Sequence, residues 1–152
     1  ILRIAKTYGD QYNDNTLISD FFLSLKKGKR KFKFASDQIF NPLYIKDLKK
    51  IVNLFLKKRI KGIFNVGGPA QLSRHECIEK ITKQFNSKNR SKISIQKTKL
   101  NSFKFIDNRP LNVTMNINKI KKIIKFKLTK IENVAKKIIA KKKLNEKLFG
   151  RR

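Results

Sequence analysis

The sequence predicts a protein of the α/β class with a mainly parallel sheet. Short β-type runs alternate along the chain with segments whose apolar residues recur at helical spacing, a pattern typical of strands joined by helices. The chain has 152 residues, of which 39% are hydrophobic, and this is enough for a sizeable core. No stretch approaches the roughly 20 consecutive apolar residues that a membrane-spanning helix requires.

The first strand and helix are indicated by residues 1–4 and 17–25. "ILRI" is a β-type run, and "TYGDQYND" follows it as a turn. Apolar residues then recur every three or four positions from Leu17 to Leu25, which predicts a helix with one buried face. Gly28 is positioned to end this helix, because glycine adopts the left-handed conformation that closes helices.

A second strand and helix follow. In "KFKFA", residues 31–35, alternation places Phe32 and Phe34 on one face of a strand. After an irregular stretch, apolar residues at helical spacing predict a helix that ends near Gly62. Its expected inner face consists of Leu48, Ile51, Val52, Phe55 and Leu56.

Residues 63–86 predict another strand and helix. "IFNV" is typical of a short buried strand, and "GGP" of a turn. "SRHE", residues 73–76, has the S-x-x-E form of a capping box, in which serine and glutamate each bond the other's backbone N–H at a helix start. The inner face of this helix should consist of Cys77, Ile78, Ile81 and Phe85.

The last part of the chain predicts a strand around Ile93 and Ile95, an irregular segment over 99–110, and a helix over about 117–124. "TKIE", residues 129–132, resembles a second capping box, which would open a terminal helix. The inward residues of that helix should be Ile131, Val134, Ile138 and Ile139, and its lysines should form the solvated face.

The formal net charge of +29 allows two interpretations, one functional and one compositional. A basic protein can bind nucleic acid or another anionic surface. Alternatively, a lysine, asparagine and isoleucine enrichment of this kind is expected from A- and T-rich codons, with lysine tolerated on exposed surfaces. Arginine, the usual reader of bases, is scarce here beside lysine.

One cysteine and one histidine limit the redox and metal chemistry. Cys77 cannot form an internal disulfide, and with His75 alone there is no cluster for zinc. We therefore expect no metal, structural roles for both residues, and a reducing, cytoplasmic location.

Two aspartates lie close together in "SDQIFNPLYIKDL", residues 36–48, of a chain with few acids. Turn and helix-cap chemistry explains Asp47 well, since an acid at a helix start accepts from free N–H groups. It explains Asp37 less well. For Asp37 and Gln38, a role in a turn and a role beside a substrate both remain open.

Five segments can be compared, in order, with a known family: "LRIAKTYGD", "DQIFNPLYIKDL", "GIFNVGG", "SRHECIEKI" and "RPLNVTMNINKI". Together they resemble the C-terminal half of the extended short-chain dehydrogenase/reductases, in particular the dTDP-4-dehydrorhamnose reductase branch. The similarity covers residues 1 to about 140. The matching positions are Leu2, Arg3, Tyr8, Gly9, Asp37, Gln38, Pro42, Asp47, Leu48, 62–66, Arg109 and Pro110.

This resemblance implies the later strands of a Rossmann-like doubly wound parallel sheet plus a small α/β substrate-binding lobe, with residues 1–4 and 63–66 in one sheet. It implies that Asp37 and Gln38 face a nucleotide-sugar substrate and that Arg109 holds its diphosphate. A guanidinium can bind a diphosphate bidentately while staying charged. The alternative for Arg109 is a generic surface cation. Lys6 stands where the pattern commonly has an aromatic residue at the site, so the sugar is left open.

The family's chemistry is hydride transfer with NAD(P), using a Tyr-x-x-x-Lys pair and a glycine-rich phosphate loop. No tyrosine here has a lysine four positions later, and "GIFNVGG" has the wrong spacing for that loop. We therefore expect residues 1–152 to be the substrate-binding portion of a longer protein, inactive and without tight cofactor binding alone, and a homodimer when intact. A basic nucleic-acid-binding protein and a non-catalytic regulatory relative are the alternatives.

Overall fold

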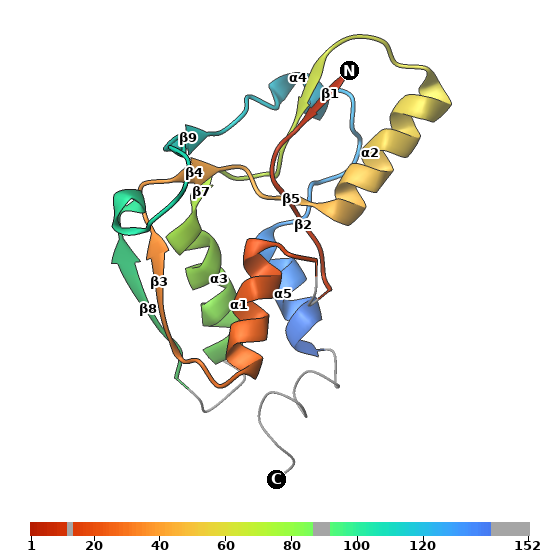
Figure 1. Ribbon diagram of the computed structural model, residues 1–152. Coiled ribbons are helices and arrows are strands. Elements are labelled where there is room, and N and C mark those ends of the chain that lie inside the picture. Colours follow the sequence, from red (N-terminus) through yellow and green to blue (C-terminus); the bar gives the residue numbers. More distant parts are fainter. Residues whose placement is uncertain (12–13, 87–91, 141–152) are drawn as a thin grey trace.

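The computed structural model describes residues 1–11, 14–86 and 92–140 and has a mixed α/β fold (Figure 1). The strands are β1 (Leu2–Ile4), β2 (Thr7–Tyr8), β3 (Lys31–Ala35), β4 (Ile39–Phe40), β5 (Leu43–Tyr44), β6 (Phe64–Val66), β7 (Leu72–Ser73), β8 (Ser94–Thr98) and β9 (Asn112–Val113). The helices are α1 (Leu17–Lys26), α2 (Ile45–Lys58), α3 (Arg74–Asn86), the 3₁₀ helix η1 (Leu100–Ser102), α4 (Asn118–Lys121) and α5 (Ile131–Ala140).

The strand pairs are mainly parallel, as the alternation of strands and helices predicted. β1 pairs with β6 in parallel, with Arg3 opposite Asn65. The first strand and the "IFNV" strand therefore lie in one sheet, which confirms the expectation. β2 pairs with β5, and β3 with β8, also in parallel. In the remaining sheet, β4 lies between antiparallel β7 and parallel β9.

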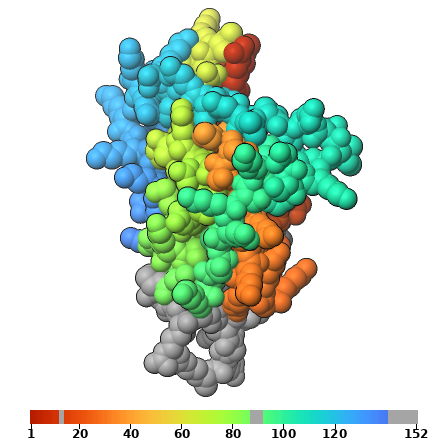
Figure 2. All heavy atoms as spheres, turned by 90° about the vertical axis from the view of Figure 1, so that its left-hand side faces the viewer, coloured from red at the N-terminus to blue at the C-terminus, as the bar shows by residue number. Residues whose placement is uncertain are grey.

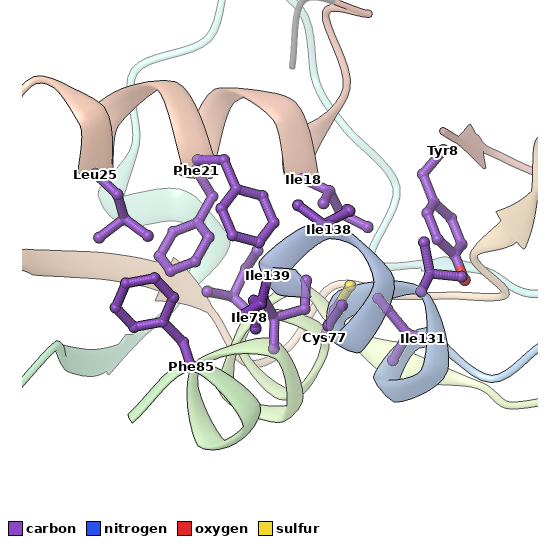
Figure 3. Close-up of a cluster of buried hydrophobic side chains, with 14 of the residues drawn as sticks. Tyr8, Ile18, Phe21, Leu25, Cys77, Ile78, Phe85, Ile131, Ile138 and Ile139 are labelled. Carbon is purple, nitrogen blue, oxygen red and sulfur yellow. The ribbon is translucent and has the colours of Figure 1, made fainter. Parts of the chain in front are cut away.

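Three helices and a strand pair enclose the first hydrophobic core. α1, α3 and α5 lie together on one side of β3 and β8 (Figure 1). Phe21, Leu25, Ile78, Phe85 and Ile139 point into the space between the three helices (Figure 3), and each is at most 2% exposed. The rings of Phe32 and Phe34 stack at 6.1 Å, which confirms that the two side chains share one strand face.

A second core lies between α2, β6 and the segment around α4. Its fully buried residues include Leu43, Ile51, Val66 and Ile120. The rings of Phe55 on α2 and Phe64 on β6 meet edge to face at 5.0 Å. This core fixes the helix α2 against the β1–β6 pair.

The capping predictions succeed at α3. Ser73 N–H donates to Glu76 at 2.7 Å, and Glu76 N–H donates to the Ser73 hydroxyl at 3.1 Å, so the "SRHE" capping box is confirmed. α1 also begins with a reciprocal box, between Thr16 and Ser19, which the sequence analysis missed because serine replaces the usual glutamate. Gly28 follows the C-cap of α1 with φ of 89°, as expected.

The second helix differs from its prediction at its end and on its face. α2 stops at Lys58, and Arg59 adopts the left-handed conformation with φ of 50°, so the helix ends four residues before Gly62. Leu56, expected to point inward, is 71% exposed. Helical spacing alone allowed a wider inner face than the core of this protein covers.

The role expected of Asp47 as a cap of its own helix is wrong. Asp47 does lie in the first turn of α2, but its buried carboxylate accepts from the backbone N–H and, at 3.0 Å, the hydroxyl of Thr129. The "TKIE" box is not formed, because among the described hydrogen bonds none joins Thr129 and Glu132, and α5 begins only at Ile131. Glu132 instead accepts from Lys80 at 2.7 Å.

The helix predicted over 117–124 is shorter than expected. α4 covers four residues, Asn118–Lys121. It is preceded by the two-residue strand β9, Asn112–Val113, which was not predicted from the sequence. Ile120 and Ile124 are still buried, as the spacing required, because the chain after α4 continues along the same core. The last lysines of the predicted terminal helix, beyond residue 140, lie outside the described residues.

His75 and Cys77 are both buried in the fold, at 4% and 1% exposure. Burial raises the pKa of the Cys77 thiol, which keeps the sulfur protonated at neutral pH. Over the described ranges, no helix is long and apolar enough to cross a membrane, and no three or more His, Cys, Asp or Glu side chains gather as a metal site. The cytoplasmic location stays a prediction.

The Asp47 contacts generate the first prediction. Asp47→Ala removes an ionised acceptor shared by the Thr129 N–H and hydroxyl, so the free energy of unfolding should fall by about 1.5 to 3 kcal/mol. Urea denaturation followed by circular dichroism measures this. The control Asp107→Ala changes an exposed acid and should stay within about 0.5 kcal/mol of wild type. Equal midpoints for the two variants would contradict the role of Asp47.

The free edge of β1 generates the second prediction. Ile1 and Ala5 exchange backbone bonds with β6, so by alternation the backbone groups of Ile4 face the other edge, where the described residues supply no strand. With Ile1 80% and Ile4 45% exposed, we expect this edge to pair with a second copy. Sedimentation velocity should show concentration-dependent association. Ile4→Pro, which deletes the edge donor, should reduce it more than Ile4→Ala, and equal behaviour would exclude edge pairing.

Candidate functional site

The segment between β8 and β9 protrudes from the molecule and borders a cavity. Residues 100–111 extend beside β3 and β4 (Figure 2). The cavity has a volume of about 360 Å³. Among its lining residues are Asp37, Phe105 and Arg109. Two of the residues predicted from sequence for a substrate site, Asp37 and Arg109, therefore border the same cavity.

Asp37 fixes the start of this protruding segment. Its carboxylate accepts from the backbone N–H of Leu100 at 2.8 Å, across 63 positions of sequence. Asp37 is half-buried, so part of it faces the cavity. Its turn role and its place at the cavity are thus compatible, because the bond to Leu100 is itself what shapes the cavity wall.

Gln38 fixes the end of the same segment. Its side chain is buried, its amide nitrogen donates to the Pro110 carbonyl at 3.0 Å, and its amide oxygen accepts from the Nε of Arg74. The Gln38 carbonyl also accepts from the Arg74 N–H at 3.2 Å. One glutamine therefore joins the start of α3 to the residue that follows Arg109.

Arg109 presents its guanidinium at the surface. The guanidinium carbon lies 3.9 Å from the centre of the Phe105 ring, an arrangement that stabilises the cation and limits its orientations. Within the part of the chain that the structure describes, no carboxylate pairs with Arg109. A stacked guanidinium with unused donors can bind an oxyanion bidentately.

Lys6 lies at the bend between β1 and β2, where its carbonyl accepts from the Leu43 N–H at 3.0 Å. Burial lowers the pKa of Lys6, and the positive charges of Arg74 and Arg109 lower it further, while Asp20 opposes them. Burial and Arg109 likewise lower the pKa of Arg74. Lys6, Arg74 and Arg109 are therefore close enough to repel one another.

We call these three residues the cation cluster. Sequence reasoning proposed Lys6 and Arg109 but missed Arg74, which was considered only as part of a capping box. The scarcity of arginine in this lysine-rich chain was a signal that could have found it. Repulsion among three cations, which Asp20 offsets only in part at Lys6, is favourable to the binding of an anion with more than one negative charge.

The described tyrosines near the site are poorly suited to proton transfer at neutral pH. Burial raises the pKa of Tyr8, whose hydroxyl has no hydrogen-bond partner among the described residues. Burial also raises the pKa of Tyr44, and its hydroxyl donates to the Asp10 carboxylate at 3.2 Å. The described residues thus offer binding groups here, and neither of the two described tyrosines has a lowered pKa.

The positive charge is not confined to this site. Exposed lysines occur on β3, as Lys31 and Lys33, and on α2, as Lys49 and Lys50, and these two elements lie on opposite sides of the molecule (Figure 1). A nucleic-acid-binding protein usually concentrates its cations on one face or along one stripe. The observed distribution does not favour that alternative.

Comparison with known protein families identifies one model. The model described as the RmlD substrate binding domain matches residues 1–144. A search of curated proteins gave no significant match.

Solved structures share the fold at low sequence identity. dTDP-4-dehydrorhamnose reductase from Yersinia enterocolitica has a TM-score of 0.77 at 18% identity, over 91% of this chain and 48% of that one. The same enzyme from Bacillus anthracis, solved with NADP, has 0.73 at 21%, over 91% and 47%. UDP-N-acetylglucosamine 4-epimerase from Bacillus cereus has 0.64 at 24%, over 91% and 44%. The chain thus spans about half the length of these structures, and the likeness shows the fold alone.

The cation cluster generates a prediction on pH. Removing one positive charge by Arg74→Gln should raise the pKa of Lys6 towards its ordinary value, because the ammonium then meets less repulsion. The ¹³Cε chemical shift of Lys6, assigned by comparison with Lys6→Arg and followed against pH, measures this. Lys33→Gln, a charge removal on the exposed side of β3, should leave the Lys6 titration unchanged. If the pKa of Lys6 is equal in wild type and Arg74→Gln, Arg74 does not repel Lys6 and the two residues do not belong to one cluster.

Proposed function

The chain belongs to the RmlD substrate binding domain family, and on this premise we propose that it forms the sugar-nucleotide-binding half of an NAD(P)-dependent oxidoreductase similar to dTDP-4-dehydrorhamnose reductase. The substrate class follows from the family, whose domain binds the substrate of sugar-nucleotide reductases. The observation that supports the proposal is the cation cluster of Lys6, Arg74 and Arg109. It lies beside Asp37 and Gln38, and Asp37 and Arg109 line the same cavity.

In this proposal the cation cluster binds the diphosphate of the sugar nucleotide. Arg109 supplies a planar fork that matches two phosphate oxygens, and its stacking on Phe105 reduces the entropy lost on binding. Arg74 is held in place through its Nε bond to Gln38, so its terminal nitrogens remain available. Bound phosphate would relieve the repulsion that lowers the pKa of Lys6.

Asp37 and Gln38 then act by positioning. Their bonds to Leu100 and Pro110 hold both ends of the protruding segment, so Arg109 is presented at a fixed place on the cavity rim. The cavity of about 360 Å³ falls in the size range of small-ligand sites, about 300 to 1,000 Å³. We propose that it receives the nucleoside or sugar part of the substrate.

The glycines of this chain do not have the spacing of a glycine-rich phosphate loop. The Gly67–Gly68 turn follows strand β6, and a Cβ at Gly68 would lie 1.7 Å from the Pro42 carbonyl oxygen, so this turn packs directly on Pro42. We therefore propose that NAD(P) binds in the part of a longer gene product that corresponds to the other half of the matched structures. A role in surface polysaccharide synthesis and a cytoplasmic location belong to the same proposal.

The decisive variants are at Arg109 in the complete gene product. Arg109→Ala should weaken binding of dTDP-glucose by about 1.5 to 3 kcal/mol, the range for hydrogen bonds to charged groups, with NAD(P) binding unchanged. Arg109→Lys should recover part of the loss, because an ammonium keeps the charge but lacks the fork. Isothermal titration calorimetry at fixed ionic strength measures all three proteins.

Lys33→Ala is the matched control, an exposed cation on β3 outside the site, and it should change affinity by no more than about 0.5 kcal/mol. If Arg109→Ala behaves like this control, Arg109 is a generic surface cation and the diphosphate does not bind at the cation cluster. If wild type binds neither dTDP-glucose nor UDP-N-acetylglucosamine, the proposed substrate class is wrong.

A further inference from the structure

A second cavity, of about 470 Å³, lies away from the cation cluster between α2 and the segment after α4. Leu54, Ile123 and Phe126 contribute its apolar surface, and all three also pack against the second core, so the floor is held rigidly. Lys50, Lys57 and Lys125 stand around it. We call this cavity and its lysines the lysine-rimmed groove.

The charged residues that line this groove are all lysines. From Leu48 to His75 and from Asn108 to Ile131, every charged residue other than histidine is lysine or arginine. The nearest acid in sequence, Asp47, is buried and bonded to Thr129, so it does not neutralise the rim. The ammonium of Lys50 makes a cation–π contact with Phe126, 5.3 Å from the ring centre. An occupant must therefore supply its own negative charges.

From this combination we infer that the groove docks an acidic amphipathic helix of a partner protein. Apolar side chains on one face of such a helix would enter the groove, and carboxylates flanking them would pair with the lysines. The lining from Lys50 to Lys58 extends about 12 Å along α2 at 1.5 Å per residue, which accommodates apolar residues one and two helical turns apart.

The partial burial of the apolar lining residues distinguishes this occupant from other anionic partners. An interfacial membrane contact needs apolar side chains that project into the lipid, whereas Leu54 and Ile123 are partly buried at the base of a concavity. A nucleic-acid backbone would use the lysines but would leave the apolar floor without a partner.

A binding measurement tests the inference. The probe is a fluorescein-labelled synthetic peptide of about 14 residues, about four helical turns, with leucines on one face and glutamates on the other. Fluorescence anisotropy with the wild-type chain should show saturable binding that weakens as salt rises. Asn53→Trp, which fills the groove from an exposed lining position without changing charge, should weaken binding at least about tenfold.

Charge is tested separately. Lys57→Glu/Lys58→Glu should also weaken binding at least about tenfold, whereas Lys31→Glu/Lys33→Glu, the same charge change on β3, should have a much smaller effect. Equal binding of a peptide with the same composition but no apolar face, or no effect of Asn53→Trp, would overturn the inference. So would phosphatidylglycerol vesicles or a poly(dT) oligonucleotide that bind as tightly as the peptide and lose binding in Asn53→Trp.

Discussion

The buried Gln38 side chain is the interaction on which the site of this protein depends. Its amide accepts from Arg74 on α3 and donates to the carbonyl of Pro110, so it joins a strand end, a helix start and the protruding segment. A buried amide left unpaired costs about 1 to 3 kcal/mol, which favours the single arrangement in which both of its ends are bonded. Gln38 therefore links Arg74 directly to the residue that follows Arg109.

The residues around Gln38 extend the same principle. Asp37 bonds to Leu100, Asn41 accepts from the Met115 N–H at 2.7 Å, and Asp47 bonds to Thr129, so these three side chains contact three distant positions through buried or half-buried polar groups. Gly68 allows its turn to pack directly on Pro42. The chain can therefore hold three repelling cations at one surface, because bonds of Asp37, Gln38, Asn41 and Asp47 to distant parts of the backbone fix the surrounding chain.

Much of the fold follows from the sequence. The buried faces of α1, α3 and α5, the strands at 31–35 and 64–66, and the capping box at Ser73 were all predicted, because apolar periodicity and capping depend on residues within one or two helical turns. The parallel pairing of β1 with β6 followed from the family resemblance. Asp37 and Arg109 were named as site residues from the same pattern, and they border one cavity.

Tertiary structure decided the remaining features, since each depends on a partner far away in the sequence. Asp47 and Thr129 both carry local capping signals, yet they bond to each other, because a buried carboxylate is better satisfied by two donors across the core than by one in its own turn. Arg74 bonds to Gln38, 36 positions earlier in the sequence, a contact that no local pattern predicts. Leu56 fits the helical period but is exposed, since the period gives the spacing of a face and not the width that a core covers.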